Sequence, residues 1–466
     1  MMKRLLTLAC SVFLTYFHAN AQLRLPAILS SGMVLQQNDS VYLWGWANPD
    51  EPITINTSWN NQDYKLKGLN TGKWKIKIST PAAGGPYTIT VKGWSGNIVL
   101  SDVLIGEVWI CSGQSNMEWS YYNGEKDIPN ELANCYNKNI RFFHIPRSSS
   151  DYPQEDVYAQ WKVCDSNSLK SFSAVGYFFG KKLNSELNIP IGLINASWGG
   201  TSAEAWTPAE TIQSNAELNK AANILTEVPW GPVKPGKLYN GIIAPITSYS
   251  IAGALWYQGE ANVPNGETYS KLLAAMIDSW RSLFRKQFPF YLVQIAPFTY
   301  GRPFEGSIVQ EQQTKLLQNP NTGVVIVTDL IDSVSNIHPS HKKEVGTRLA
   351  NWALAETYHK TGIAYKSPSF KSMEIKKNKI ILSFIDADNG LIAKDKIITG
   401  FYICGNNKEW LPAEAKIDNN KIILSNKKIT DPVQVRYGFG NTVIGNVFSK
   451  EGLPLIPFRT DDWKVQ

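Results

Sequence analysis

The chain has 466 residues, of which 43% are hydrophobic and 18% charged, with a formal net charge of +7 at pH 7. This length is enough for one large domain and one or two smaller ones. Such a small positive excess argues against nucleic-acid binding, which usually shows clustered basic patches.

The N-terminus has the layout of a secretory signal peptide. Lys3 and Arg4 precede an apolar run at 5–17, and small residues at 19 and 21 form a cleavage pattern. An N-terminal membrane anchor is the alternative, but the run is short for a bilayer span. No later stretch approaches the roughly 20 apolar residues that a membrane helix needs. We therefore expect 1–21 to be removed and the protein to be exported, to the periplasm or outside the cell.

Residues 22–100 have the pattern of a small β-rich domain. Apolar and polar residues alternate in short runs separated by Asn, Asp, Gly and Pro, at 40–47, 53–59, 73–79 and 87–94. Regular short strands with such turns are typical of a β-sandwich.

Residues 101–360 change to a pattern of buried strands and helices. Continuous apolar runs occur at 103–111, 189–198, 251–259, 288–296 and 322–330. Helical patterns lie between or after several of them, at 174–187, 268–284 and 342–359. This alternation predicts an α/β domain with a parallel sheet covered on both faces. Ligand sites in such sheets lie beyond the carboxyl ends of the strands.

Residues 361–466 return to short alternating strands, at 372–385, 398–404, 421–426 and 432–439. We expect a second β-rich segment that packs against the α/β domain. Because both flanking segments are short, they could also join into one composite sandwich.

The first motif with chemical character is Cys111-Ser112-Gly113-Gln114-Ser115-Asn116, directly after a predicted buried strand. A serine on a tight turn at a strand end can present its hydroxyl as a nucleophile and its amide to an oxyanion. Seen alone, such a sequence is more often an ordinary turn.

The second motif, Ser197-Trp198-Gly199-Gly200-Thr201, also follows a predicted strand. Adjacent glycines leave their amides unobstructed, which suits the binding of developing negative charge. A simple strand-to-helix turn is the alternative.

The third motif is Trp256-Tyr257-Gln258-Gly259-Glu260-Ala261-Asn262. The side-chain amide of Gln258 can donate to an oxyanion without a change of charge. A buried structural role is the alternative.

The fourth motif is Ile337-His338-Pro339, which follows the strand predicted at 322–330. After removal of 1–21 the remaining histidines are His144, His338, His341 and His359. Of these, His338 and His341 lie in a loop beyond a predicted buried strand. Pro339 biases the backbone of His338 away from helix, which favours a defined loop position.

In this order and placement, the four motifs resemble those of the SGNH hydrolases. The strings GEVWICSGQSNMEW, ASWGGTSAEAW, LYNGIIAPI, LWYQGEAN, IHPSHKKEVGTRLA and EGLPLIPFRTDDW resemble the bacterial sialate O-acetylesterase family over nearly the whole mature chain. The resemblance implies an SGNH-type α/β core of three layers at 101–360, with β-sandwich-like segments at 22–100 and 361–466. It implies no cofactor, and no metal-ligand cluster or phosphate-binding loop is evident in the sequence.

The resemblance also implies roles for particular residues. Ser115 would be the nucleophile and His338 the base, while the amides of Ser115 and Gly199 would bind the oxyanion. The superfamily pattern of a glycine followed by any residue and then Ser or Thr selects Gly199 over Gly200. The superfamily asparagine that acts as a third donor is missing here, and Gln258 is the proposed substitute.

A second departure concerns the acid that orients the histidine. The superfamily places an aspartate three residues before the histidine, where this chain has Ser335. We expect either a Ser–His dyad with a backbone carbonyl as orienting group, or a carboxylate from the same loop. Asp332 is the preferred carboxylate and Asp329 the other candidate.

These expectations describe an exported carbohydrate esterase that removes O-acetyl groups from sialic acids through an acetyl-enzyme. The first alternative keeps the chemistry and changes the substrate to acetylxylan or another polysaccharide. The second is a non-catalytic carbohydrate-binding protein, which would have no need for Ser115 and His338 to lie within hydrogen-bonding reach.

Overall fold

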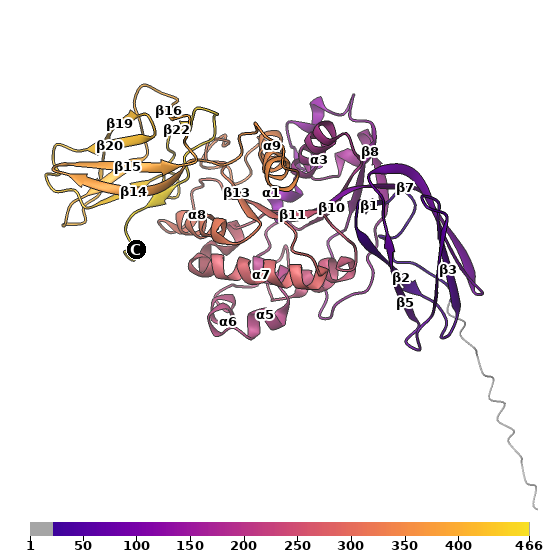
Figure 1. The fold of residues 1–466 in the computed structure, drawn as a ribbon. Helices are drawn as coiled ribbons and strands as arrows, with labels where there is room; N and C mark the ends of the chain where they lie inside the picture. The colour runs from indigo at the N-terminus through magenta and orange to yellow at the C-terminus, as the bar shows by residue number, and fades with distance from the viewer. Residues whose placement is uncertain (1–21, 466) are drawn as a thin grey trace, which may run out of the picture.

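The structure, a computed structural model, describes residues 22–465 (Figure 1). The predicted signal peptide at 1–21 lies outside the described residues. Within 22–465, no helix is both long enough and apolar enough to cross a membrane. A central α/β region carries β-rich regions at its two opposite ends (Figure 1).

The central region is built on a sheet whose strands follow the order β13-β12-β11-β7-β10-β8-β9. The bounds of these strands are β13 (Thr322–Val325), β12 (Phe290–Val293), β11 (Gly253–Tyr257), β7 (Gly96–Gly113), β10 (Ile191–Ser197), β8 (Asn137–His144) and β9 (Trp161–Cys164). Neighbouring strands run parallel except β8 and β9, which are antiparallel. Every residue of β10, β11, β12 and β13 is buried, as expected for strands covered on both faces.

The two faces of the sheet carry separate hydrophobic clusters. Along β7, Val108 and Ile110 belong to one cluster, while Trp109 and Cys111 belong to the other, because successive side chains of a strand point to opposite faces. The main helices divide between these clusters: α7 (Tyr269–Phe284) and α8 (Glu305–Lys315) on the first face, α3 (Ala174–Leu187) and α9 (Lys342–Trp352) on the second. The predicted three-layer α/β core is confirmed.

The helices differ from expectation in two places. The helix expected at 342–359 ends at Trp352 and continues as a wider helical turn, Ala353–Thr357. Helix α8 has no counterpart in the predicted elements. Shorter helices lie in the connections: α1 (Ser115–Glu118), α2 (Ser166–Lys170), α4 (Ala203–Trp206), α5 (Ala209–Gln213) and α6 (Ala216–Ala222).

The N-terminal β region is continuous with the central sheet. Its strands are β1 (Val34–Gln36), β2 (Ser40–Trp46), β3 (Pro52–Thr57), β4 (Gln62–Lys67), β5 (Lys73–Ser79) and β6 (Gly84–Gly93). Strand β7 has 18 residues. Its first part pairs antiparallel with β6, and its last part pairs with β10 and β11. The boundary expected at residue 100 therefore falls inside one strand.

The C-terminal β region has a hydrophobic cluster of its own. Its strands are β14 (Ser369–Lys376), β15 (Lys379–Ile385), β16 (Leu391–Ala393), β17 (Phe401–Cys404), β18 (Leu411–Pro412), β19 (Glu414–Asp418), β20 (Lys421–Ser425), β21 (Gln434–Tyr437), β22 (Val447–Ser449) and β23 (Phe458–Arg459). The two β regions lie on opposite sides of the central region (Figure 1), so the expectation of one composite sandwich is wrong.

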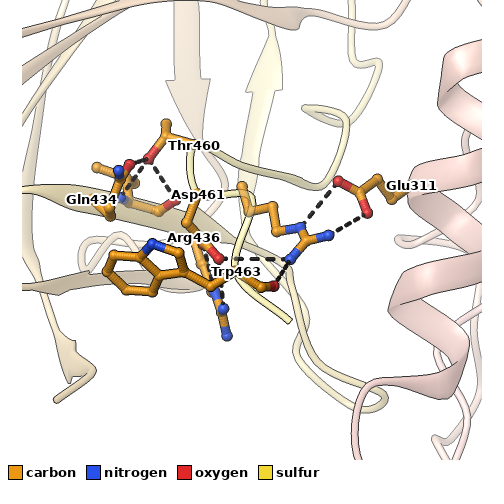
Figure 2. A network of polar contacts seen from close by, with 8 residues as sticks. Glu311, Gln434, Arg436, Thr460, Asp461 and Trp463 are labelled. Atoms are coloured by element: carbon orange, nitrogen blue, oxygen red, sulfur yellow. Dashed lines mark hydrogen bonds and ion pairs between the residues drawn. The ribbon is translucent and has the colours of Figure 1, made fainter. Parts of the chain in front are cut away.

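Arg459 connects the C-terminal β region to helix α8. Its guanidinium donates from Nε and Nη2 to the two carboxylate oxygens of Glu311, each at 3.0 Å, and from Nη1 to the carbonyl of Trp463 at 2.7 Å. The two accepting residues, Glu311 and Trp463, are labelled in Figure 2. Nearby, Arg436 donates twice to the buried carboxylate of Asp461, at 2.8 Å in both contacts. A bidentate pair fixes orientation as well as distance, so α8 is tied to the last strands in a defined geometry.

Candidate active site

Ser115 follows a turn that is fixed on both sides by neighbouring strands. Strand β7 ends at Gly113, whose φ of +132° favours glycine, and a Cβ atom there would lie 2.2 Å from the carbonyl oxygen of Tyr257. The carbonyl of Gly113 accepts from the amide of Trp198 at 3.0 Å, and the amide of Gln114 donates to Tyr257, also at 3.0 Å. The chain then enters α1 at Ser115, which places this residue at the carboxyl end of the sheet.

His338 lies against Ser115. Its Nε2 atom is 2.8 Å from the Oγ atom of Ser115, across 223 positions of sequence. The backbone of His338 is held twice by Asn336, whose Oδ1 accepts from the His338 amide at 3.0 Å and whose Nδ2 donates to its carbonyl at 2.9 Å. The ring of Trp119 stacks on the imidazole, with centroids 4.5 Å apart and planes 23° from parallel. The predicted serine and histidine are therefore brought together by two loops and an aromatic contact.

The surroundings of His338 keep its imidazole neutral. Burial, followed by the nearby positive charge of Lys342, lowers the pKa of His338 to about 4. A neutral imidazole at neutral pH has an acceptor nitrogen, so it can take a proton from the hydroxyl of Ser115.

Neither candidate carboxylate contacts His338. The carboxylate of Asp332 accepts from Ser340, at 2.9 Å from its amide and 2.6 Å from its hydroxyl, and lies 3.8 Å from Nε2 of His341. Asp329 forms a bidentate pair with Arg348, at 2.8 and 2.7 Å. Within residues 22–465, Nδ1 of His338 makes no hydrogen bond to a protein group. Of the two expected alternatives, the contact of Asp332 with His338 is not formed, because the carboxylate of Asp332 is bonded to Ser340. Within the same described residues, no backbone carbonyl accepts from Nδ1 either.

The Gly199 amide faces a carboxylate next to Ser115. It donates to Oε2 of Glu118 at 2.8 Å, and Glu118 in turn accepts from Nε and Nη2 of Arg147 at 2.6 and 2.7 Å. A Cβ atom built on Gly199 would lie 3.2 Å from the Cβ of Ser115. The amide therefore binds an anionic oxygen close to the hydroxyl of Ser115, and that oxygen belongs to Glu118.

Gln258, the expected side-chain donor to an oxyanion, is used elsewhere. The residue is fully buried. Its Nε2 donates to the carbonyl of Thr201 at 3.1 Å and to Asn262 at 2.8 Å, while its Oε1 accepts from the hydroxyl of Tyr269 at 2.8 Å. Both hydrogens of the amide nitrogen are thereby committed, so the prediction that Gln258 donates to the oxyanion is wrong. The residue packs behind the site.

A buried polar network lies beneath Ser115. Asn116 donates to Oε1 of Glu260 at 2.7 Å and to the carbonyl of Ile337 at 3.0 Å, and it accepts from Nζ of Lys342 at 2.6 Å. Burial raises the pKa of Glu260 and lowers that of Lys342 to about 8. Asn116 thus joins the helix that begins at Ser115 to the residue directly before His338. No role was predicted for this network from the sequence, although Asn116 and Glu260 stand within its motifs.

A cavity of about 560 Å³ opens over Ser115 and His338. Its wall includes the polar side chains of Glu118, Arg147 and Glu260. Apolar side chains complete the wall, among them Trp119, Leu225, Val228, Trp230, Val263 and Pro264. The described residues contain no group of three or more His, Cys, Asp or Glu side chains arranged to hold a metal ion.

Comparison with known proteins identifies a matching family model and several similar proteins. Residues 105–355 match the family model described as carbohydrate esterase, sialic acid-specific acetylesterase. Human sialate O-acetylesterase is 28% identical, with 84% of this chain and 82% of the human protein aligned. The mouse sialate O-acetylesterase is 26% identical, with 89% of each chain aligned.

A solved structure gives a closer likeness. The crystal structure of a carbohydrate acetylesterase from Xanthomonas citri superposes with a TM-score of 0.87 at 34% sequence identity, covering 95% of this chain and all of the other. The family match and this superposition cover the central region and both β regions. The chain is therefore a carboxylic ester hydrolase that belongs to the sialic acid-specific acetylesterase family of carbohydrate esterases.

Proposed function

We propose that the protein removes O-acetyl groups from sialic acids by a Ser–His mechanism. In the first half-reaction, Oγ of Ser115 attacks the acetyl carbonyl carbon while Nε2 of His338 takes the hydroxyl proton. The tetrahedral intermediate then breaks its bond to the sugar oxygen, which receives that proton from His338. The products are the free sugar hydroxyl and an acetyl ester on Ser115.

In the second half-reaction, water attacks the acetyl carbon and His338 again takes the proton. Collapse of this intermediate returns the proton to Oγ of Ser115 and releases acetate. The observation that carries the proposal is the distance of 2.8 Å between Nε2 of His338 and Oγ of Ser115. A carbohydrate-binding protein without catalytic activity would not need this contact.

The amides of Ser115 and Gly199 are the proposed oxyanion donors. That the Gly199 amide accommodates a carboxylate oxygen at 2.8 Å supports its capacity to bind an anionic oxygen. For the reaction to use this amide, the Glu118 side chain must turn aside. Its two contacts with Arg147 would hold the displaced carboxylate nearby.

One observation favours the alternative of a neutral glycan, such as acetylxylan, as substrate. Arg147 is the one Lys or Arg side chain among the described residues that line the cavity. Its guanidinium already makes a bidentate pair with Glu118. A sialic acid carboxylate would therefore have to compete with Glu118 for this cation, whereas a neutral sugar would not.

We also propose that the protein is exported, on the basis of the signal-peptide pattern at 1–21. N-terminal sequencing of the protein recovered from its natural compartment would test this, and an intact Met1 would contradict it.

The substrate is tested by assaying the purified protein on 9-O-acetylated N-acetylneuraminic acid and on acetylated xylan side by side, with acetate release as the readout. A higher kcat/KM on the sialic acid supports the proposal. A higher value on xylan supports the neutral-glycan alternative. No acetate from either substrate, with 4-nitrophenyl acetate still cleaved, would contradict a carbohydrate substrate of these classes.

A further inference from the structure

Trp230 is an exposed indole in the wall of the catalytic cavity. The residue is 58% exposed, and it lines the same cavity as Ser115 and His338. In contrast, Trp206 and Trp256, which stand within the sequence motifs, are fully buried in the core. An accessible tryptophan face is therefore found here on the segment that connects α6 to the rest of the α/β region.

The indole is held in one position by its polar edge. Its Nε1 donates to the carbonyl of Gly200 at 3.2 Å, and its backbone carbonyl accepts from the indole of Trp198 at 2.8 Å. A Cβ atom on Gly200 would lie 2.4 Å from the Trp230 Nε1, so this glycine is what lets the ring approach the turn so closely. Val228 and Gly231 form an antiparallel bridge that closes the segment around Trp230.

The turn that holds Trp230 is the turn that faces Ser115. Gly199 packs against Ser115 on one side, and Gly200, the next residue, packs against the indole. The polar atom of the ring, Nε1, is bonded to the turn, so the ring surface that stays exposed is apolar. A ring fixed before binding loses little conformational entropy when a ligand covers it.

Sugar rings have a chemistry that matches such a surface. Their C–H faces are apolar and pack on aromatic rings, while their hydroxyls and ester groups need polar partners. The cavity that Trp230 lines offers both kinds of partner, the polar side chains of Arg147 and Glu118 and the apolar side chains of Leu225 and Val228.

We propose that Trp230 is the stacking platform for the acetylated sugar and so determines specificity for sugar esters over simple acetyl esters. This inference rests on the proposed function. In the productive complex the acetyl group lies at Ser115 while the sugar ring that bears it, or its neighbour in a glycan, covers the indole.

The test compares Trp230→Ala and Trp230→Phe with Trp94→Ala, a control at another tryptophan that is 65% exposed and lies in the N-terminal β region. Each variant is assayed on 4-nitrophenyl acetate and on whichever acetylated sugar the wild type hydrolyses. Trp230→Ala should raise KM for the sugar ester roughly tenfold, the scale of a lost aromatic contact, with Trp230→Phe in between. Its kcat/KM on 4-nitrophenyl acetate should stay within about twofold of wild type, and Trp94→Ala should match wild type on both substrates.

An unchanged KM for the sugar ester in Trp230→Ala would overturn the stacking role and leave the proposed function intact. Equal losses on both substrates would also overturn it, because they would mean that the indole merely supports the Gly199–Gly200 turn. A wild-type enzyme that cleaves 4-nitrophenyl acetate and no acetylated sugar would overturn the proposed function and this inference with it.

Discussion

Trp119 stacks on the imidazole of His338, with ring centroids 4.5 Å apart. Trp119 comes from the end of α1, four residues after Ser115, so the helix that presents the serine also supplies a surface for the histidine. In the described part of the chain, no carboxylate contacts Nδ1 of His338, the ring nitrogen that does not face Ser115. Orientation of the ring therefore depends on Trp119, on Ser115 and on the two backbone contacts from Asn336.

Replacement of Trp119 should accordingly reduce turnover without removing any proton-transfer group. We expect Trp119→Ala to slow turnover of 4-nitrophenyl acetate by about 10- to 100-fold, because small displacements of a catalytic group are costly. Trp119→Phe, which keeps an aromatic face, should lose less. Equal activity of Trp119→Ala and wild type would show that the stack does not position His338.

Ser115→Ala and His338→Ala should each abolish measurable turnover and leave the fold intact. Loss of either member of such a pair removes the proton transfer on which attack depends, and it slows turnover by several powers of ten. Circular dichroism and the Tm of each variant check the fold. His341→Ala is the matched control, since His341 lies 3.8 Å from Asp332 and away from Ser115. An inactive His341→Ala beside an active His338→Ala would reverse the assignment of the base.

Asp332→Asn should keep activity within about threefold of wild type. Its carboxylate binds Ser340, and an asparagine oxygen can still accept from the same amide. An orienting carboxylate would behave differently, because its replacement by an amide in a catalytic triad slows turnover by about 10⁴-fold. A loss of that size would place Asp332 beside His338 during the reaction.

The pH dependence of kcat/KM should report the environment of His338. Burial and Lys342 lower its pKa to about 4, so activity should be level around neutral pH and fall on acidification through about pH 4, as the base becomes protonated. Lys342→Met removes the nearby charge but leaves the burial. The acidic limb of the pH profile, where kcat/KM falls on acidification, should therefore move to a higher pH that is still below 6.5. Lys343→Met, at the exposed neighbouring position, is the control and should leave the limb in place.

The same pKa shift has a consequence for stability. The unfolded chain protonates His338 near its ordinary pKa of 6.5, whereas the folded protein resists protonation until about pH 4. The unfolded state therefore binds more protons in this window, and the contribution of His338 to stability is lost as pH falls from 6.5 towards 4.

The pH profile of Lys342→Met can also contradict the electrostatic effect of Lys342 on His338. If its activity fell at the same acidic pH as that of wild type, Lys342 would have no such effect.

Gln258→Ala should affect stability more than catalysis. The side chain bonds to Thr201, Asn262 and Tyr269 in the buried interior, and its removal takes one hydrogen bond from each of them, at a cost of about 1–3 kcal/mol in the free energy of unfolding. Urea denaturation measures this loss, with Gln318→Ala at an exposed position as control. If turnover instead slowed by about 100-fold or more while stability stayed unchanged, the oxyanion role that the structure argues against would be restored.

The central sheet and the meeting of Ser115 with His338 were accessible from the sequence, because buried parallel strands bring residues that follow them to one edge. The direction in which each side chain points after the end of its strand could not be predicted. Gln258 and Glu260 stand two positions apart in one motif, yet Gln258 turns into the core and Glu260 reaches the cavity wall. Sequence alone carries no signal for this difference, which depends on the turn at Gly259.

Helix α8 was not predicted either, because the sequence does not reveal that several of its polar side chains are buried. Its buried residues include Gln310 and Gln313, so it lacks the apolar periodicity that identifies a helix. Gln313 instead donates to the carbonyl of Gln258 at 3.0 Å and accepts from the amide of Ile295 at 2.9 Å. Polar residues that serve as internal hydrogen-bond partners resemble solvent-exposed ones until the partners are known.

Strand β7 gives the N-terminal β region a particular mechanical relation to the chemistry. One strand, Gly96–Gly113, is bonded to β6 along its first part, with shifts of register on the way, and ends two residues before Ser115. A hinge between the two regions would have to bend this strand against hydrogen bonds on its neighbours. Because the N-terminal region shares this strand with the catalytic region, a polysaccharide bound on it would be held beside the catalytic region, and contacts made there would affect which part of a large substrate reaches the cavity.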